Sequence, residues 1–222
     1  MTVYMTAHLF FIGNNTKGQC ILPDAYIAVP TAASIDASIA VPTADSIDGR
    51  HVLQVAVGDS LSLLLTDDNL LFAVGNNDTG QLGRGHNDDD DPDNHVPRPV
   101  AGVGLERITL VAAGFGHCAA VTEGGKLFLW GRNDHGQCGT GTFGGNVLAA
   151  TQCDSGVLAD ADVRVVFVAC GWAHTVALTS DGGVIAFGYN AYGELGTGNY
   201  SDQPAPERLA CAALDGVHIM CC

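Results

Sequence analysis

Three stretches of the chain share one pattern of apolar and polar positions. They run from Val55 to Thr66, from Val111 to Thr122 and from Val168 to Thr179. In each, a short apolar run leads to a glycine, and a second apolar run follows and ends in threonine. A turn sequence such as Glu123-Gly124-Gly125 comes next. Short β-prone runs between turn signals predict strands, so each stretch is interpreted as two strands joined in a hairpin.

A glycine-rich phrase follows each hairpin. Its strong copies read LFAVGNNDTGQLGRG, LFLWGRNDHGQCGTG and IAFGYNAYGELGTG, and a weaker copy, LFFIGNNTKGQC, lies near the amino terminus. The leading glycines Gly13, Gly75, Gly131 and Gly188 are separated by 62, 56 and 57 residues. A recurrence at nearly constant spacing indicates a structural repeat.

Glycine and asparagine recur at fixed positions of the phrase. Both accept positive φ angles, and asparagine also folds its side chain back onto the local backbone, so each phrase predicts a strand running into a compact loop. Histidines near the start of the second hairpin strand are expected to bond loop backbone and tie one strand to its neighbour. The residues assigned these structural roles are Gly75, Asn77, Gly80, Gly83, Gly85, Gly114, His117, Gly131, Asn133, Gly136, Gly139, Gly171, His174, Gly188, Asn190, Gly193 and Gly196.

With one further strand, each repeat becomes a four-stranded antiparallel sheet, which is the blade of a β-propeller. The two phrases in this order resemble the regulator of chromosome condensation repeat family. The first phrase carries the resemblance at Ala113 to His117 and at Ala169 to His174, and the glycine-rich phrase carries it as G-x-N-x-x-G-x-x-G. The first repeat departs from the pattern, with Leu61 in place of the histidine. The resemblance implies an all-β propeller of seven blades, of which this chain holds about three to four.

We expect one repeat domain over residues 1–222. It would contain a partial blade at 1–22, blades at 50–100, 107–160 and 163–210, and the start of another at 211–222. Residues 23–49 hold most of a tandem duplication, IAVPTAASIDAS followed by IAVPTADSIDGR, which predicts an inserted loop or an extra strand pair. An incomplete ring leaves open sheet edges that proteins normally cover. Self-association or a second chain would complete it, and a fragment or a truncated product is the alternative.

Charge and cysteine content narrow the function. With 9 Lys+Arg against 24 Asp+Glu, the net charge of −15 disfavours nucleic acid and anionic membranes as partners. The acidic run from Asp88 to Asp93 lacks the spacing of a calcium loop and predicts a solvated loop. Eight cysteines without a C-x-x-C pair or a secretory segment indicate reduced thiols and an intracellular location, cytoplasmic or nuclear. The adjacent Cys221 and Cys222 leave lipid attachment as an alternative.

The sequence holds no familiar catalytic motif, so we expect no enzyme, no cofactor and no metal. Loop positions that vary between repeats are candidates for partner contact: Arg132, Asp134, His135, Trp172 and Tyr192. The prediction is a non-catalytic protein-protein interaction scaffold.

Two alternatives come from the resemblance. The first is guanine-nucleotide exchange on a small GTPase, although no inserted β-wedge follows Gly131. The second is light sensing, because Gly171 to Thr175 is similar to the G-W-R-H-T motif of light-sensing members, with Ala173 in place of the arginine.

Overall fold

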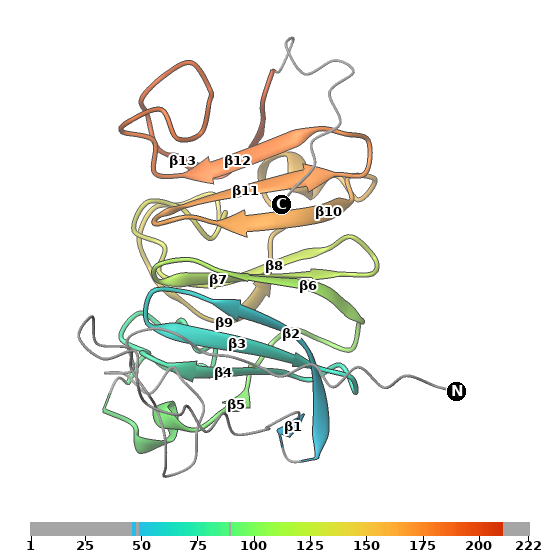
Figure 1. Cartoon of the computed structure of the whole chain (residues 1–222). Helices are drawn as coiled ribbons and strands as arrows, with labels where there is room; N and C mark the ends of the chain where they lie inside the picture. Colours follow the sequence, from blue (N-terminus) through green and yellow to red (C-terminus); the bar gives the residue numbers. More distant parts are fainter. Residues whose placement is uncertain (1–45, 48, 89, 211–222) are drawn as a thin grey trace, which may run out of the picture.

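A computed structural model describes residues 46–47, 49–88 and 90–210 of the chain (Figure 1). The expected partial blade at 1–22, most of the duplicated segment and the expected further blade at 211–222 lie outside the described residues. In the described part there is no α-helix, and none of its helical turns is long and apolar enough to cross a membrane. The all-β expectation is confirmed.

Three antiparallel sheets make up this part of the chain, and in each the strands follow one another in sequence order. The glycine-rich loop precedes the last strand of each sheet, which is β5, β9 or β13. The last residues of the duplicated segment add a short edge strand, β1, to the first sheet. The first sheet contains β1 (Ser46–Ile47), β2 (Arg50–Val57), β3 (Leu61–Thr66), β4 (Leu71–Gly75) and β5 (Arg98–Pro99). The second contains β6 (Ile108–Ala113), β7 (His117–Thr122), β8 (Leu127–Gly131) and β9 (Val147–Gln152). The third contains β10 (Val165–Cys170), β11 (His174–Thr179), β12 (Val184–Gly188) and β13 (Gln203–Arg208). Two 3₁₀ turns, η1 (Pro92–His95) and η2 (Gly156–Ala159), lie in the connections.

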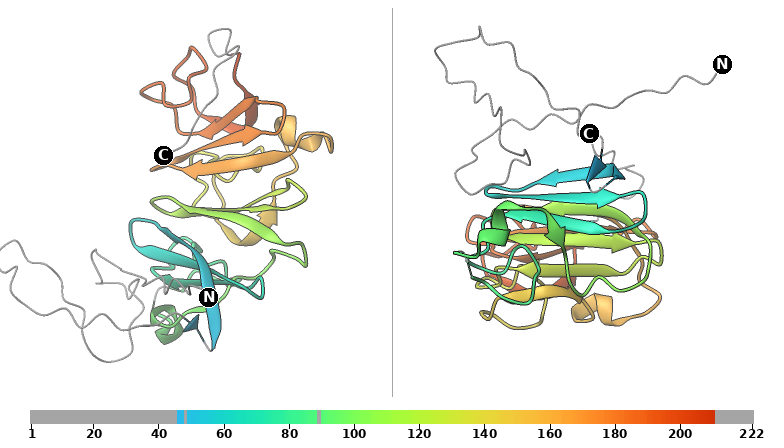
Figure 2. Two further views of the ribbon diagram at one scale, coloured as in Figure 1. Left: turned by 45° about the vertical axis from the view of Figure 1, so that its right-hand side comes forward. Right: turned by 90° about the horizontal axis from the view of Figure 1, so that it is seen from below.

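The sheets are stacked face to face in chain order, the first against the second and the second against the third (Figures 1 and 2). Both faces of the second sheet are therefore buried. On β7, Cys118 and Ala120 belong to the core shared with the first sheet, whereas Ala119 and Val121 belong to the core shared with the third. This arrangement explains why the second hairpin strand is a continuous apolar run, since side chains of alternate residues point to opposite faces.

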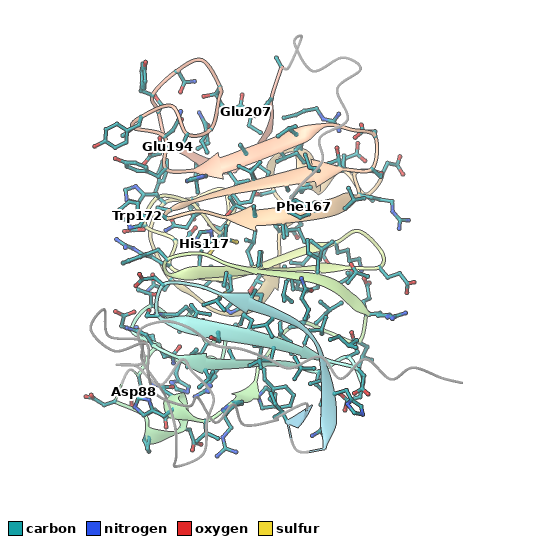
Figure 3. All side chains as sticks on the ribbon, in the orientation of Figure 1. Asp88, His117, Phe167, Trp172, Glu194 and Glu207 are labelled. Atoms are coloured by element: carbon teal, nitrogen blue, oxygen red, sulfur yellow. The ribbon has the colours of Figure 1, made fainter. Side chains whose placement is uncertain are left out.

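Each sheet presents its strand ends at the same two edges of the stack. One edge holds residues 58–60, 114–116 and 171–173 together with the glycine-rich loops after β4, β8 and β12, and we call it the loop edge. Figure 3 shows Asp88, Trp172 and Glu194 along this edge. The opposite edge holds the tight turns at 67–70, 123–126 and 180–183.

The glycine-rich loop is organised by its buried asparagine. Asn133 is fully buried, and its Oδ1 accepts a hydrogen bond from Cys138 N at 3.0 Å. Its Nδ2 donates to Thr140 Oγ1, Thr142 O and Gly144 O at 3.1 to 3.3 Å. Asn190 makes the equivalent bonds in the third repeat. One side chain thus closes the whole loop.

One glycine of this loop is required by close packing as well as by backbone conformation. Gly139 has a φ of +62°, and a Cβ added there would lie 2.8 Å from Cys153 Sγ and 2.9 Å from a ring carbon of Phe187. Both distances are shorter than real Cβ contacts. Any side chain at this position would push apart the second and third sheets.

His117 links two sheets and not two strands of one sheet. Its Nε2 lies 2.9 Å from Thr175 Oγ1 of the third sheet, and Thr175 Oγ1 donates its own proton to Gln137 O at 2.8 Å. Because the threonine proton is committed, Nε2 is the donor and the ring carries its proton there. For His117 the expected bond to loop backbone was wrong: stacking brings β11 over the ring, and the Thr175 hydroxyl is the partner of Nε2. Figure 3 shows His117 between the two sheets.

Burial sets the charge state of His117. The ring is fully buried, and desolvation, with a smaller contribution from His174, lowers its pKa to about 3. Nδ1 is buried without a hydrogen-bond partner among the described residues. The imidazole is therefore neutral at physiological pH and acts as a structural donor.

Candidate interaction surface on the loop edge

Five rings from neighbouring loops meet at the loop edge, and we call them the aromatic cluster. Trp172 is at its centre, with ring centroids 5.8 Å from Phe115, 6.2 Å from His135 and 5.7 Å from Tyr189. Tyr189 in turn lies 4.8 Å from His135 and 6.2 Å from Tyr192. Tilted and edge-to-face arrangements at these separations are the favourable geometries for aromatic pairs.

The cluster is exposed to solvent. Trp172 keeps 50% of its surface accessible, Tyr192 84% and Phe115 39%. Large apolar side chains scattered singly over a surface need no explanation, but exposed rings gathered in mutual contact make this surface a candidate interaction site. The second tryptophan does not take part, because Trp130 is fully buried and its Nε1 donates to Gln81 O at 3.0 Å.

A guanidinium group already lies against the cluster. The Cζ atom of Arg132 is 5.7 Å from the ring centroid of Trp172, within the range of a cation-π contact. Arg132 Nε also donates to Asp134 Oδ2 at 2.9 Å. Burial disfavours the ionised form of Asp134, but hydrogen bonds from Arg132 and Gln137 outweigh it and lower the pKa of the carboxyl. The pair is therefore ionic and internally balanced.

Two further carboxylates flank the rings. Asp202 Oδ2 lies 2.8 Å from His135 Nδ1, and its Oδ1 accepts from Asn190 N at 2.8 Å. Glu194 Oε2 accepts from Tyr192 N at 2.9 Å. Burial raises the pKa of the Tyr189 hydroxyl, and the nearby charges of Tyr192, Glu194 and Asp202 raise it further.

The five residues selected from the sequence as candidate contacts, Arg132, Asp134, His135, Trp172 and Tyr192, all lie in or beside this cluster. Sequence reasoning missed Phe115, Tyr189 and Asp202. A signal for the first two was present: Phe115 is the repeat equivalent of Trp172, and Tyr189 is the equivalent of Arg132. Asp202 lies in the connection to β13, where the repeat pattern fades, and gave no signal.

The first repeat presents a different chemistry on the same edge. Its equivalent positions are Asp59, Asn76 and Thr79, which are polar. The acidic loop follows, and there Asn94 is buried, with its side chain joined to Arg84 at 2.9 Å and to Asp88 O at 2.7 Å. Among the described residues, no group of three or more His, Cys, Asp and Glu side chains is placed to hold a metal ion.

A depression of about 480 Å³ opens on the opposite edge, between η2 and the turn at 180–183. Both of its arginines are already engaged: Arg208 forms an ion pair with Asp181 at 2.8 Å, and Arg164 donates to Glu123 O at 2.9 Å. The loop edge is therefore the stronger candidate.

Comparisons with known proteins agree with this architecture. Two profiles described as Regulator of chromosome condensation (RCC1) repeat match the chain, one at residues 52–81, 108–137 and 165–194 and the other at 68–121 and 124–178. Yeast Prp20p, from Saccharomyces cerevisiae, is a similar solved structure, with a TM-score of 0.62 and 25% identity over 73% of this chain and 39% of that one. Its structure was determined together with its binding properties to Gsp1p and histones.

Two curated relatives are similar in sequence. The ultraviolet-B receptor UVR8 of Arabidopsis thaliana is 35% identical over 161 residues, covering 72% of this chain and 34% of the receptor. The probable E3 ubiquitin-protein ligase HERC6 of Homo sapiens is 32% identical over 170 residues, covering 76% of this chain and 16% of the ligase. The chain thus spans about a third or less of the length of these relatives. From the first sheet to the third it matches one repeat type in sequence and in structure, and it belongs to the regulator of chromosome condensation repeat family.

Proposed function

We propose that the chain is a non-catalytic scaffold that binds a protein partner through its loop edge. The observation that carries the proposal is the aromatic cluster, in which exposed rings of Trp172 and Tyr192 are held by contacts with other rings. Tryptophan and tyrosine are enriched at binding hot spots, because a rigid ring buries a large area at a small cost in side-chain entropy.

The loops that carry these rings support the proposal. Each is closed by one buried asparagine, and a glutamine or glutamate four residues further along accepts a backbone N–H in the same loop, as Gln137 does from His135 N at 2.9 Å. The two positions that directly follow the asparagine, such as Asp134 and His135, differ between the repeats, whereas the loop is kept. A constant scaffold with variable, pre-ordered loops reduces the entropy lost on binding.

Photo-crosslinking in cells tests this proposal. A benzophenone amino acid at Tyr192 should give a discrete crosslinked adduct, and adding Trp172→Ala should abolish it because a central ring of the cluster is lost. The matched control carries the probe at Phe143, which is 56% exposed in the same loop region but has no ring contact with the cluster among the described residues. Equal adducts at both positions would reject the aromatic cluster as the contact site, and no adduct at either position would reject the loop edge as the binding surface.

A small GTPase is a second candidate partner, and the similarity to Prp20p, whose binding to Gsp1p was studied with its structure, supports it. Release of a fluorescent guanine nucleotide from purified Gsp1p tests exchange directly. Acceleration that is lost in Trp172→Ala would establish exchange through this edge, and a rate equal to the spontaneous one would remove the candidate.

We also propose that the far face of the third sheet receives a further repeat, from a second copy, from another chain or from a longer form of the same protein. On β11, His174, Val176 and Leu178 are half-buried, whereas their β7 equivalents are fully covered by the third sheet. Where the third sheet covers the second, Phe115 N also donates a hydrogen bond to Gly171 O at 3.3 Å.

Light scattering should give about twice the 22.9 kDa of the chain if a second copy fills the face. Val176→Arg should then restore the monomer, while Val166→Arg, on an exposed position, should not.

A further inference from the structure

The loop edge combines exposed rings with unbalanced negative charge. Beside the aromatic cluster lie Asp134, Glu194 and Asp202, and the cation in direct contact with the rings is Arg132, whose charge is matched by Asp134. The carboxylates of Glu194 and Asp202 therefore leave the surface around Tyr189 and Tyr192 negative. The chain as a whole carries −15, so the far field has the same sign.

Resting on the proposed protein-binding function, we infer that the loop edge binds a basic protein segment by receiving an arginine or lysine side chain against the rings of Trp172 and Tyr192, beside the carboxylates of Glu194 and Asp202. The position of Arg132 over Trp172 demonstrates that the indole accepts a guanidinium within this chain. A second cation gains the same attraction from the ring faces and a charge-assisted bond to a carboxylate.

Charge selects this class of partner over others. An acidic segment would meet two carboxylates and an acidic chain, and a nucleic acid would meet the same repulsion. An uncharged apolar segment could contact the rings but would bury Glu194 and Asp202 without supplying a cation for them, which is costly for ionised groups. A basic segment satisfies the rings and the carboxylates together.

Comparison of the repeats identifies a substitution that removes one negative charge and keeps the loop. Glu194 occupies the loop position that is Gln81 in the first repeat and Gln137 in the second, and each of the three accepts a backbone N–H two residues before it. Glu194→Gln therefore removes one negative charge while keeping the hydrogen bond. Glu207→Gln on β13 removes the same charge outside the cluster and is the matched control; Figure 3 shows both residues.

The experiment measures binding of the full chain to a fluorescently labelled peptide of alternating arginine and glycine, from the rise in the fluorescence anisotropy of the peptide. A second peptide replaces each arginine by citrulline, which keeps the shape and loses the charge. The arginine peptide should bind at low salt and weaken as salt is raised, and the citrulline peptide should bind at least tenfold more weakly. Trp172→Ala should weaken arginine-peptide binding about tenfold and Glu194→Gln about threefold, whereas Phe143→Ala and Glu207→Gln should leave it unchanged.

The inference is overturned if the citrulline peptide binds as well as the arginine peptide, if the two control variants weaken binding as much as the two test variants, or if the arginine peptide does not bind at low salt. Thermal unfolding of each variant establishes that it is folded. If Trp172→Ala is not folded, Glu194→Gln alone decides the test. Crosslinking through Tyr192 without arginine-peptide binding would reject the basic partner and leave the proposed function standing, whereas loss of both signals would reject both.

Discussion

The buried imidazole of His117 makes the fold sensitive to mild acid. In the unfolded chain a histidine has a pKa near 6.5, but burial lowers the pKa of His117 to about 3 in the folded state. Between these two values the unfolded state binds one more proton than the folded state, so the free energy of unfolding rises with pH across this window. The stability that neutral His117 contributes is lost progressively as the pH falls from 6.5 towards 3. The slope is about 1.4 kcal/mol per pH unit, which amounts to ~2 kcal/mol between pH 7 and pH 5.

Replacing His117 by leucine isolates this effect, and the first repeat already has Leu61 at the equivalent position. The variant loses the bond to Thr175, worth about 1 kcal/mol, but it also removes the unpartnered Nδ1, and Thr175 keeps its bond to Gln137 O. We expect little change in stability at pH 7. Between pH 7 and pH 5 the wild type should then lose ~2 kcal/mol more than His117→Leu.

Urea unfolding at several pH values, followed by the fluorescence of buried Trp130, measures both proteins in the same way. The other seven histidines are common to both, so their contributions cancel in the difference. Parallel pH profiles for the two proteins would refute the reasoning, as would a variant that is more acid-sensitive than the wild type.

Three further predictions concern the repeat scaffold. Asn133→Ala removes up to four hydrogen bonds from a buried loop and should cost about 2 to 4 kcal/mol in urea unfolding, whereas exposed Asn146→Ala should be near neutral. Gly139→Ala meets two side chains inside 3.0 Å and should lower the melting temperature clearly more than Gly141→Ala, which has a similar positive φ but a nearest neighbour at 3.8 Å. Burial raises the pKa of the buried thiols, so iodoacetamide at pH 8 should leave them unlabelled in the folded protein and label them after denaturation, as read by peptide mass spectrometry; labelling in the folded state would contradict the packing. These thiols are Cys118, Cys138 and Cys153.

The hairpins and loops were predictable from the sequence because the same local pattern recurs in each repeat. The apolar runs predicted hairpins, and β2–β3, β6–β7 and β10–β11 are such pairs. The glycine-rich phrase predicted a strand entering a compact loop, and the buried bonds of Asn133 and Asn190 follow from residues within eleven positions of each other. Turn and loop conformations depend on nearby residues, so their signals survive in one sequence.

Contacts between sheets were not predictable in the same way. His117 and Thr175 are 58 positions apart, and Phe115 and Trp172 are 57 apart, yet each pair meets where one sheet packs on the next. An apolar run states that a strand is buried but not which neighbour covers each face, and so the histidine partner was predicted wrongly. The sequence by itself determined the repeat, the all-β class and the residues that shape each loop. Only the stacking of the sheets decided that single variable positions from successive repeats gather into one aromatic and acidic surface, because that surface depends on packing between segments that share no local signal.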